Sequence, residues 1–290
     1  MPTPRSPLAY VAGSALSFAV MALAAKLVSR TMPGDQVAFL RFLLMLTPFA
    51  ASPALVRRAL VVQRVDLLAY RGIFGGTAVL LYFLAIEHVP VGTATLLNYS
   101  SPVFAVAFAA AFLGERVQTR LLVPLVVALV GVALVTGVFG NGGEPFRIGK
   151  WEAAGLLSSV LSGAAVTAIR AARRTEGSWA IYGSFTICGL AVTAPFALAR
   201  FRWPNGVEWA LLVVVGATSV AAQLLMTYAY RWVTNLQAGV FAQLTVVASM
   251  GLGAVFLGER LSPLQLVGAA LAIAGVLGVV AMHRPPRAVE

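Results

Sequence analysis

The chain has 290 residues, of which 60% are hydrophobic and only 11% are charged, and its formal net charge is +11. A soluble domain carries roughly 25% charged residues, so a soluble fold of this length could not cover its surface with polar side chains. The basic residues are spread singly or in pairs between apolar runs, which argues against a nucleic-acid-binding surface. We expect a membrane protein whose partners are the lipid bilayer and a small-molecule substrate, with no nucleic acid.

Charge-free apolar runs recur from end to end of the chain, each long enough to cross a bilayer at about 1.5 Å per residue. Turn residues separate these runs, and the longest polar link is Gly140–Pro145. The pattern predicts an all-α integral membrane protein with ten transmembrane helices. In chain order they are expected at residues 8–29, 34–56, 66–87, 91–113, 119–139, 151–172, 178–200, 207–231, 234–257 and 262–282.

An internal repeat relates the two halves of the chain. The pentapeptide Phe-Leu-Gly-Glu-Arg occurs at 112–116 and again at 256–260, and the same offset of 144 residues lays Gly131 on Gly275. We therefore predict two duplicated five-helix domains, residues 1–140 and 141–290. Because five is an odd number, the second domain enters the membrane from the opposite side, which predicts inverted repeats around a central cavity.

The charged residues at the ends of the predicted helices set the expected topology. Lys and Arg are more numerous in the loops on the side of the N-terminus, which favours two cytoplasmic termini. In the duplicated pentapeptide, Glu115, Arg116, Glu259 and Arg260 are expected to be structural. The two arginines can cap helix C-termini and position the last helix of each repeat.

With these features the chain resembles the drug/metabolite transporter superfamily, in particular its ten-helix exporters built from two EamA-type repeats. The resemblance covers essentially the whole chain. It rests on the doubled Phe-Leu-Gly-Glu-Arg, on Tyr99-Ser100-Ser101-Pro102 in the fourth predicted helix and on Arg41 in the second. Within the superfamily the chain looks most like the exporters of aromatic and other neutral amino acids, such as threonine and methionine.

The resemblance implies a basket-shaped helix bundle in a bacterial inner membrane. Helices 1, 3, 4, 6, 8 and 9 would line a central cavity, and helices 5 and 10 would lie at the periphery. It also implies export by alternating access, and a pair of repeats of this kind can function as a monomer.

Polar residues at membrane depth are candidates for substrate contacts, because burying them in hydrocarbon is costly unless they face a cavity or a partner. The fourth predicted helix carries three of them, Asn98, Tyr99 and Ser100. The other candidates are Tyr82, Gln223, Gln243, Ser158 and Ser162. As an alternative, the amides could hydrogen-bond neighbouring helices, and the serines could serve close helix packing.

Three residues are candidate hinges for a change of access. Pro102 lacks the N–H that would bond to the carbonyl of Asn98, so it is expected to kink the fourth helix. Gly72 in the third helix is related to Gly216 in the eighth by the repeat offset. Both glycines could instead serve close packing between helices.

Charged residues in the predicted spans are few. No Asp or Glu lies in the middle of a span, while Arg41 and Arg71 lie nearer the helix ends. For Arg41 a structural role, bonding helix-end carbonyls, is favoured over attraction of a substrate carboxylate. We therefore expect a cavity without a fixed charge, which suits neutral amino acids or similar metabolites better than phosphorylated sugars.

The sequence accordingly favours a transporter working by uncoupled facilitated diffusion. Two histidines, His88 and His283, with the single Cys188, cannot assemble a catalytic or metal centre, so neither enzyme activity nor a cofactor nor a metal is expected. One alternative is a proton-coupled exporter of another metabolite or a drug. A channel or a membrane scaffold is an alternative of a different class.

Overall fold

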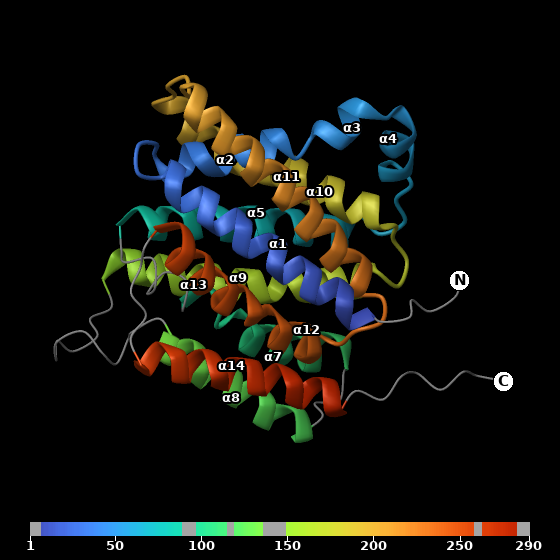
Figure 1. Cartoon of the computed structure of the whole chain (residues 1–290). Coiled ribbons are helices and arrows are strands. Elements are labelled where there is room, and N and C mark those ends of the chain that lie inside the picture. Colours follow the sequence, from blue (N-terminus) through green and yellow to red (C-terminus); the bar gives the residue numbers. More distant parts are fainter. Residues whose placement is uncertain (1–6, 89–96, 115–118, 136–148, 258–262, 283–290) are drawn as a thin grey trace.

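The computed structural model describes residues 7–88, 97–114, 119–135, 149–257 and 263–282, and over these ranges all regular structure is helical. Figure 1 shows the long helices running side by side across the molecule, with α8 and α14 together at the bottom of the view. The helices are α1 (Pro7–Val28), α2 (Gly34–Leu44), α3 (Thr47–Ala51), α4 (Pro53–Ala59), α5 (Val65–His88), α7 (Ser101–Leu113), α8 (Thr119–Val135), α9 (Lys150–Ala172), α10 (Ser178–Ala199), α11 (Gly206–Ala229), α12 (Asn235–Ala242), α13 (Leu244–Leu257) and α14 (Pro263–Met282).

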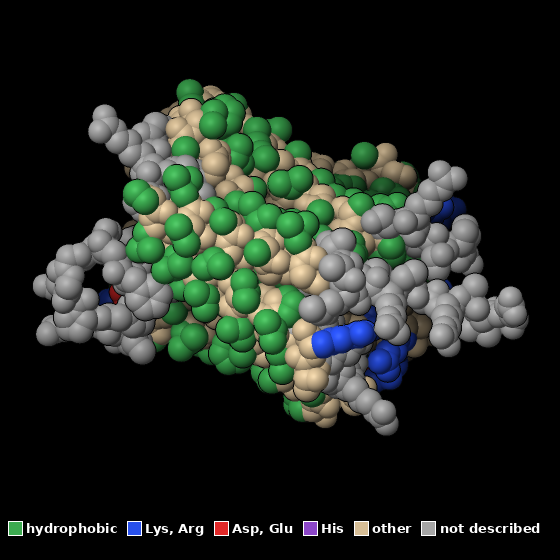
Figure 2. Space-filling model, turned by 60° about the horizontal axis from the view of Figure 1, so that its bottom comes forward, with side chains coloured by type: hydrophobic (Ala, Val, Ile, Leu, Met, Phe, Trp, Pro, Cys, Tyr) green, Lys and Arg blue, Asp and Glu red, His purple; other side chains and the backbone are tan. Residues whose placement is uncertain are grey.

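The described helices support a membrane-embedded fold but do not establish ten spans. Six segments are long and apolar enough to cross a membrane, or seven if the bent segment from Gly34 to Ala59 counts as one. Shorter apolar stretches lie in α7, α8 and α14. On the face shown in Figure 2, hydrophobic side chains cover the middle of the molecule, and the visible Lys and Arg side chains lie towards its ends. That distribution matches a protein whose middle contacts lipid.

The second predicted helix does not run unbroken from 34 to 56. It ends at Leu44, and after α3 the chain bends by 110° into α4. Proline explains the first break, because Pro48 lacks the N–H that would bond to the carbonyl of Leu44. The Thr47 hydroxyl donates to that carbonyl instead, at 2.8 Å, and the Tyr182 hydroxyl donates to the Met45 carbonyl at 2.6 Å. The prediction of one straight helix from 34 to 56 is therefore wrong.

The fourth and ninth predicted helices are interrupted at equivalent positions. Tyr99 and Ser100 form a turn before α7, and Gln243 separates α12 from α13. Tyr99 and Gln243 are 144 residues apart, and the Gln243 amide Nε2 donates to the Tyr99 carbonyl at 3.3 Å. A hydrogen bond between two residues related by the repeat offset places both close to the line where the two halves meet.

The helix contacts repeat with the same offset. The offset lays α1 on α9 and α5 on α11, and the structure packs both α1 against α11 and α5 against α9. It also lays α8 on α14, and these two helices pack against each other. In each case a helix of one half packs against a helix of the other half, and the equivalent pair does the same. A two-fold relation between the halves produces this pattern.

Single glycines make the α8–α14 contact close. A Cβ on Gly275 would lie 2.6 Å from the Pro124 carbonyl oxygen and 2.8 Å from the Ala128 Cβ. A Cβ on Gly131 would collide with Gly268 and Ala272, which are the offset equivalents of Pro124 and Ala128. Lipid is as apolar as a leucine side chain, so helices in a bilayer associate through such close packing rather than through the hydrophobic effect.

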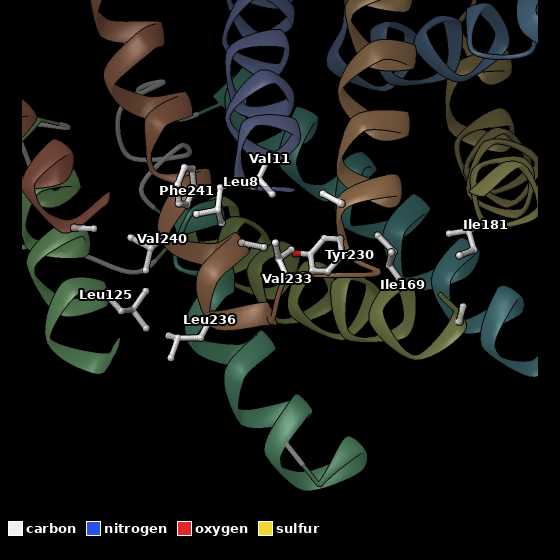
Figure 3. Close-up of a cluster of buried hydrophobic side chains, with 14 of the residues drawn as sticks. Leu8, Val11, Leu125, Ile169, Ile181, Tyr230, Val233, Leu236, Val240 and Phe241 are labelled. Carbon is white, nitrogen blue, oxygen red and sulfur yellow. The ribbon is translucent and has the colours of Figure 1, made fainter. Parts of the chain in front are cut away.

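A cluster of buried hydrophobic side chains fixes the connection between α11 and α12. Tyr230 and Val233 in that connection pack with Leu8 and Val11 of α1 and with Leu236 of α12 (Figure 3). The Arg170 guanidinium also donates to the Tyr230 carbonyl at 2.9 Å. The short helix α12 is therefore held against the start of α1.

Polar contacts join the loops at another point of the bundle. Between α1 and α2, Thr31 donates to the Glu208 carboxylate at 2.6 Å, and Arg202 forms an ion pair with the same carboxylate at 2.6 Å. The hydrogen bond to the Glu208 carboxylate raises the pKa of Arg202, because it stabilises the charged guanidinium. Arg200 pairs with Asp35 at 3.1 Å. The α1–α2 and α10–α11 connections are thus tied together.

Candidate functional site: a cavity between the two halves

A cavity of about 180 Å³ lies between the two halves of the chain. Its wall includes residues of α1, α5 and α7 from the first half and of α9, α11, α12 and α13 from the second. Arg41 of α2 and Phe185 of α10 also contribute. The volume corresponds to roughly a dozen water-sized groups, which is the scale of a small organic molecule.

The structure brings several of the sequence-predicted candidates to this wall and leaves others outside it. The candidates that line the cavity are Tyr82, Asn98, Tyr99, Pro102, Ser162 and Gln223. Ser100 lies in the turn before α7 and is not among the lining residues. Glu115, Arg116, Glu259 and Arg260 fall outside the described residues, so their structural role stays a prediction.

Ser158 and Gln243 serve contacts between helices rather than the cavity wall. The Ser158 hydroxyl donates to the Ala78 carbonyl at 2.8 Å and accepts from the Asn98 amide at 2.9 Å. The Gln243 amide donates to the carbonyl of Gly239 within its own helix and to that of Tyr99. Both residues therefore act one layer behind the wall, where they position Asn98 and Tyr99.

The predicted hinge glycines lie at tight helix contacts. A Cβ on Gly72 would lie 2.8 Å from the Ser184 carbonyl oxygen, and one on Gly216 would lie 2.6 Å from the Leu44 Cβ. Helices α5 and α11 continue without a break through these two positions. This geometry favours the close-packing alternative for both glycines. Pro102, in contrast, follows the turn at Tyr99 and packs on Gly239 of α12.

Two buried arginines make the cavity positively charged, so the expectation of a cavity without a fixed charge is wrong. Arg41 is 2% exposed and Arg71 is 3% exposed, and both line the cavity. Each lies within about two turns of a predicted boundary, so both were expected near helix ends. Packing of α2 and α5 against α10 places both guanidinium groups at the wall.

Each arginine is held by neutral partners. The Arg41 Nε donates to the Ser219 hydroxyl at 2.7 Å, and an Arg71 terminal nitrogen donates to the Gln223 Oε1 at 2.9 Å. The Arg71 guanidinium carbon lies 3.9 Å from the centroid of the Phe185 ring, a cation–π distance. The described residues that line the cavity include no Asp, Glu, Lys or His.

The same wall presents further polar groups. The Asn235 amide donates to the Ala105 carbonyl at 3.1 Å and to the Thr167 hydroxyl at 2.9 Å, while its Oδ1 is buried without a partner. Tyr82, Tyr99 and Ser162 are further polar residues of the wall. The cavity can therefore offer hydrogen-bond donors and acceptors together with positive charge.

Comparison with known proteins assigns the fold to a family. The model of the EamA-like transporter family matches residues 5–137 and again residues 149–281. The chain belongs to the EamA-like transporter family. Both matched segments contribute residues to the wall of the cavity.

Individual relatives of this EamA-like transporter include named exporters. The pseudopaline exporter of Pseudomonas aeruginosa is 30% identical over 277 residues, which are 92% of this chain and 91% of that protein. The probable terminal-alkyne amino-acid exporter of Streptantibioticus cattleyicolor is 31% identical over 66% of this chain and 64% of its own length. A solved crystal structure shares the fold with a TM-score of 0.74, over 93% of this chain and 96% of that chain, at 21% identity. The protein is a membrane transporter.

Proposed function

We propose that this EamA-like transporter exports an amino acid or a small amino-acid-derived metabolite by alternating access, across a bacterial inner membrane with both termini in the cytoplasm. The observation that carries the proposal is the cavity between two matched halves in a chain whose relatives include named exporters. Transporters built from inverted repeats bind substrate where the repeats meet. The named exporter of an amino acid among the relatives supports the substrate class.

The interrupted helices supply the moving parts in this proposal. The turn at Tyr99 and the short interruption at Gln243 would be the points at which α7 and α12 tilt relative to the segments that adjoin them. The Gln243–Tyr99 hydrogen bond couples the two breaks. Rocking of one repeat against the other would open the cavity to alternate sides. Pro102, packed on Gly239, would transmit the tilt of one half to the other.

We further propose that transport is uncoupled from protons. The described cavity lining contains no carboxylate or histidine that could take up and release a proton during the cycle. A substrate would then move down its own concentration gradient. The proton-coupled alternative requires a titratable group that reaches the cavity.

The test is counterflow in liposomes containing the purified full chain. Vesicles loaded with an unlabelled amino acid should transiently accumulate the radiolabelled form without a pH gradient. Gln243→Ala should lower the initial rate by about threefold to thirtyfold, because an interhelical hydrogen bond in a membrane contributes about 0.6 to 2 kcal/mol. Gln63→Ala, in an exposed segment between α4 and α5, is the matched control and should leave the rate unchanged.

Three results would count against the proposal. Uptake that occurs without counterflow would indicate a channel. Uptake only under an imposed pH gradient would indicate proton coupling. A Gln243→Ala variant that transports at the wild-type rate would show that the coupling of the two breaks plays no part in transport.

A further inference from the structure

The two cavity arginines form a buried, positively charged site. Arg41 and Arg71 are among the most deeply buried charged residues of the described chain, at 2% and 3% exposed. They lie on α2 and α5, and both approach the same Phe185 ring, at 6.0 Å and 3.9 Å from its centroid. Two like charges that share one ring repel each other, and burial weakens the screening by water.

Neutral groups do not satisfy the two guanidinium groups. A guanidinium carries five N–H donors, and each arginine donates one hydrogen bond to a described acceptor, at Ser219 or at Gln223. The Arg71 Nε is buried without any partner. Within the described part of the chain, neither arginine forms an ion pair with a carboxylate. Buried charges in proteins are ordinarily paired, so this site lacks its counter-charge.

The surrounding backbone is shaped to hold Arg71 in place. A Cβ on Gly75 would collide with a terminal nitrogen of Arg71 and would lie 3.0 Å from two atoms of the Phe185 ring. The glycine therefore leaves the space that the guanidinium occupies. The residue at the offset-equivalent position is Ser219, which accepts the hydrogen bond from Arg41. Gly75 of its own helix thus leaves room for Arg71, while Ser219 of the facing helix α11 holds Arg41, and both side chains line the cavity.

We propose that the substrate supplies the missing negative charge and is a small molecule with two carboxylates. Arg41 and Arg71 would each bind one carboxylate, since the planar guanidinium fork matches carboxylate geometry. A zwitterion with one carboxylate would leave one arginine unpaired, and the described lining offers no carboxylate to its ammonium group. Acidic amino acids and amino-acid-derived dicarboxylates fit this charge and the cavity of about 180 Å³. This inference rests on the proposed export function and defines its substrate class.

Binding is tested by thermal unfolding of the purified full chain at matched ionic strength. The dicarboxylates are L-glutamate, L-aspartate and succinate. The comparison compounds are L-glutamine, glycerol 3-phosphate and sodium chloride. Glutamine is the matched ligand control, because it replaces one carboxylate of glutamate by a neutral amide. At least one dicarboxylate should raise the unfolding midpoint, while glutamine and chloride should not. Glutamine equal to glutamate, a response to the phosphate ester only, or no response to any dicarboxylate would overturn the inference.

Variants separate a binding role from a structural one. Arg41→Gln and Arg71→Gln should weaken the apparent affinity for the dicarboxylate at least tenfold. Without ligand they should unfold at the same temperature as the wild type or higher, because an uncompensated buried charge is removed. Arg64→Gln, at an exposed ion pair outside the cavity, is the control and should retain full binding. Variants that lose stability yet keep the dicarboxylate response would show that the arginines are structural only.

Transport distinguishes this inference from the proposed function. Counterflow of glutamate or aspartate, lost in Arg71→Gln, supports both. Counterflow of neutral amino acids alone keeps the export function and overturns the dicarboxylate inference. Dicarboxylate binding without transport of any compound keeps the binding site and overturns the export function.

Discussion

Two regions of the molecule follow the internal repeat to different degrees. One is its frame, by which we mean the contacts between helices, and the other is the set of side chains at the cavity wall. Among the helix contacts, the Ser14 hydroxyl donates to the Ala222 carbonyl and the Ser158 hydroxyl donates to the Ala78 carbonyl, both at 2.8 Å, and the two bonds are related by the 144-residue offset. This symmetry holds although Ser14 and Ala78 also border the cavity. The offset pairs the two arginines and two tyrosines of the wall with unlike residues. These pairs are Arg41 with Phe185, Arg71 with Val215, Tyr82 with Met226 and Tyr99 with Gln243.

This difference indicates which positions determine helix packing and which determine the polar and charged groups that the cavity presents. Close helix approach has the same steric requirement in both halves, so equivalent small residues occur at equivalent contacts. A substrate without two-fold symmetry has no such requirement, and a cavity on the line between the halves can present unlike groups on its two sides. Among the described lining residues, the positive charge therefore comes from the first half, from α2 and α5.

The largest expected effect is a loss of stability at the α8–α14 contact. It tests whether this part of the frame is symmetric. Gly131→Ala and Gly275→Ala should each lower the free energy of unfolding by about 1–3 kcal/mol, since the added methyl group meets backbone atoms of the facing helix. Thermal or denaturant unfolding in detergent measures the loss. Gly251→Ala is the matched control, because a Cβ there meets nothing within 4 Å. Strongly unequal losses at Gly131 and Gly275 would contradict the two-fold contact.

The next effect separates packing from hinge motion at the second symmetric glycine pair. Gly72→Ala and Gly216→Ala should lower stability by about 1–2 kcal/mol, because their neighbours, including the Ser184 carbonyl and Leu44, must move to accept a methyl group. Unfolding and counterflow are measured on the same preparations. A large loss of transport with unchanged stability would instead support the hinge role.

A smaller effect compares the two symmetric serine bonds. Ser14→Ala should cost about 0.6 kcal/mol, the average for an interhelical hydrogen bond in a membrane. Ser158→Ala should cost more, because Ser158 also accepts from the Asn98 amide at 2.9 Å. A double-mutant cycle with Asn98→Ala isolates that second bond. Equal costs for the two serines, with zero coupling to Asn98, would show that the Asn98 contact contributes nothing.

The smallest expected effect lies outside both regions. Arg64 pairs with Asp66 at 2.7 Å, but the side chains are 53% and 49% exposed. Exposed ion pairs contribute little because water and salt screen them. Arg64→Gln should leave the unfolding midpoint and the counterflow rate unchanged. A clear loss of transport here would indicate that this end of α5 moves with the transport cycle.

Several elements could be predicted from sequence because a single physical constraint fixes each of them. Helices α1, α5, α9, α10 and α11 begin and end within two residues of the predicted positions, since an apolar run must satisfy its backbone hydrogen bonds internally. Tyr82, Tyr99 and Gln223 were predicted for the cavity because polar side chains at membrane depth need a partner. The break after Leu44 was missed, although Pro48 and Pro53 were signals for it. The ten-helix count and the domain boundaries remain predictions.

The sequence by itself determined that the chain is a duplicated, membrane-embedded helical protein, because composition and a fixed repeat offset leave little freedom in those properties. It also named five of the polar residues at the described cavity wall, Tyr82, Asn98, Tyr99, Ser162 and Gln223. Only the tertiary structure decided that Arg41 and Arg71 face the same cavity and share the Phe185 ring. The charge of a cavity depends on how helices far apart in sequence are rotated against each other, and that rotation is set by packing rather than by the hydropathy of any one helix.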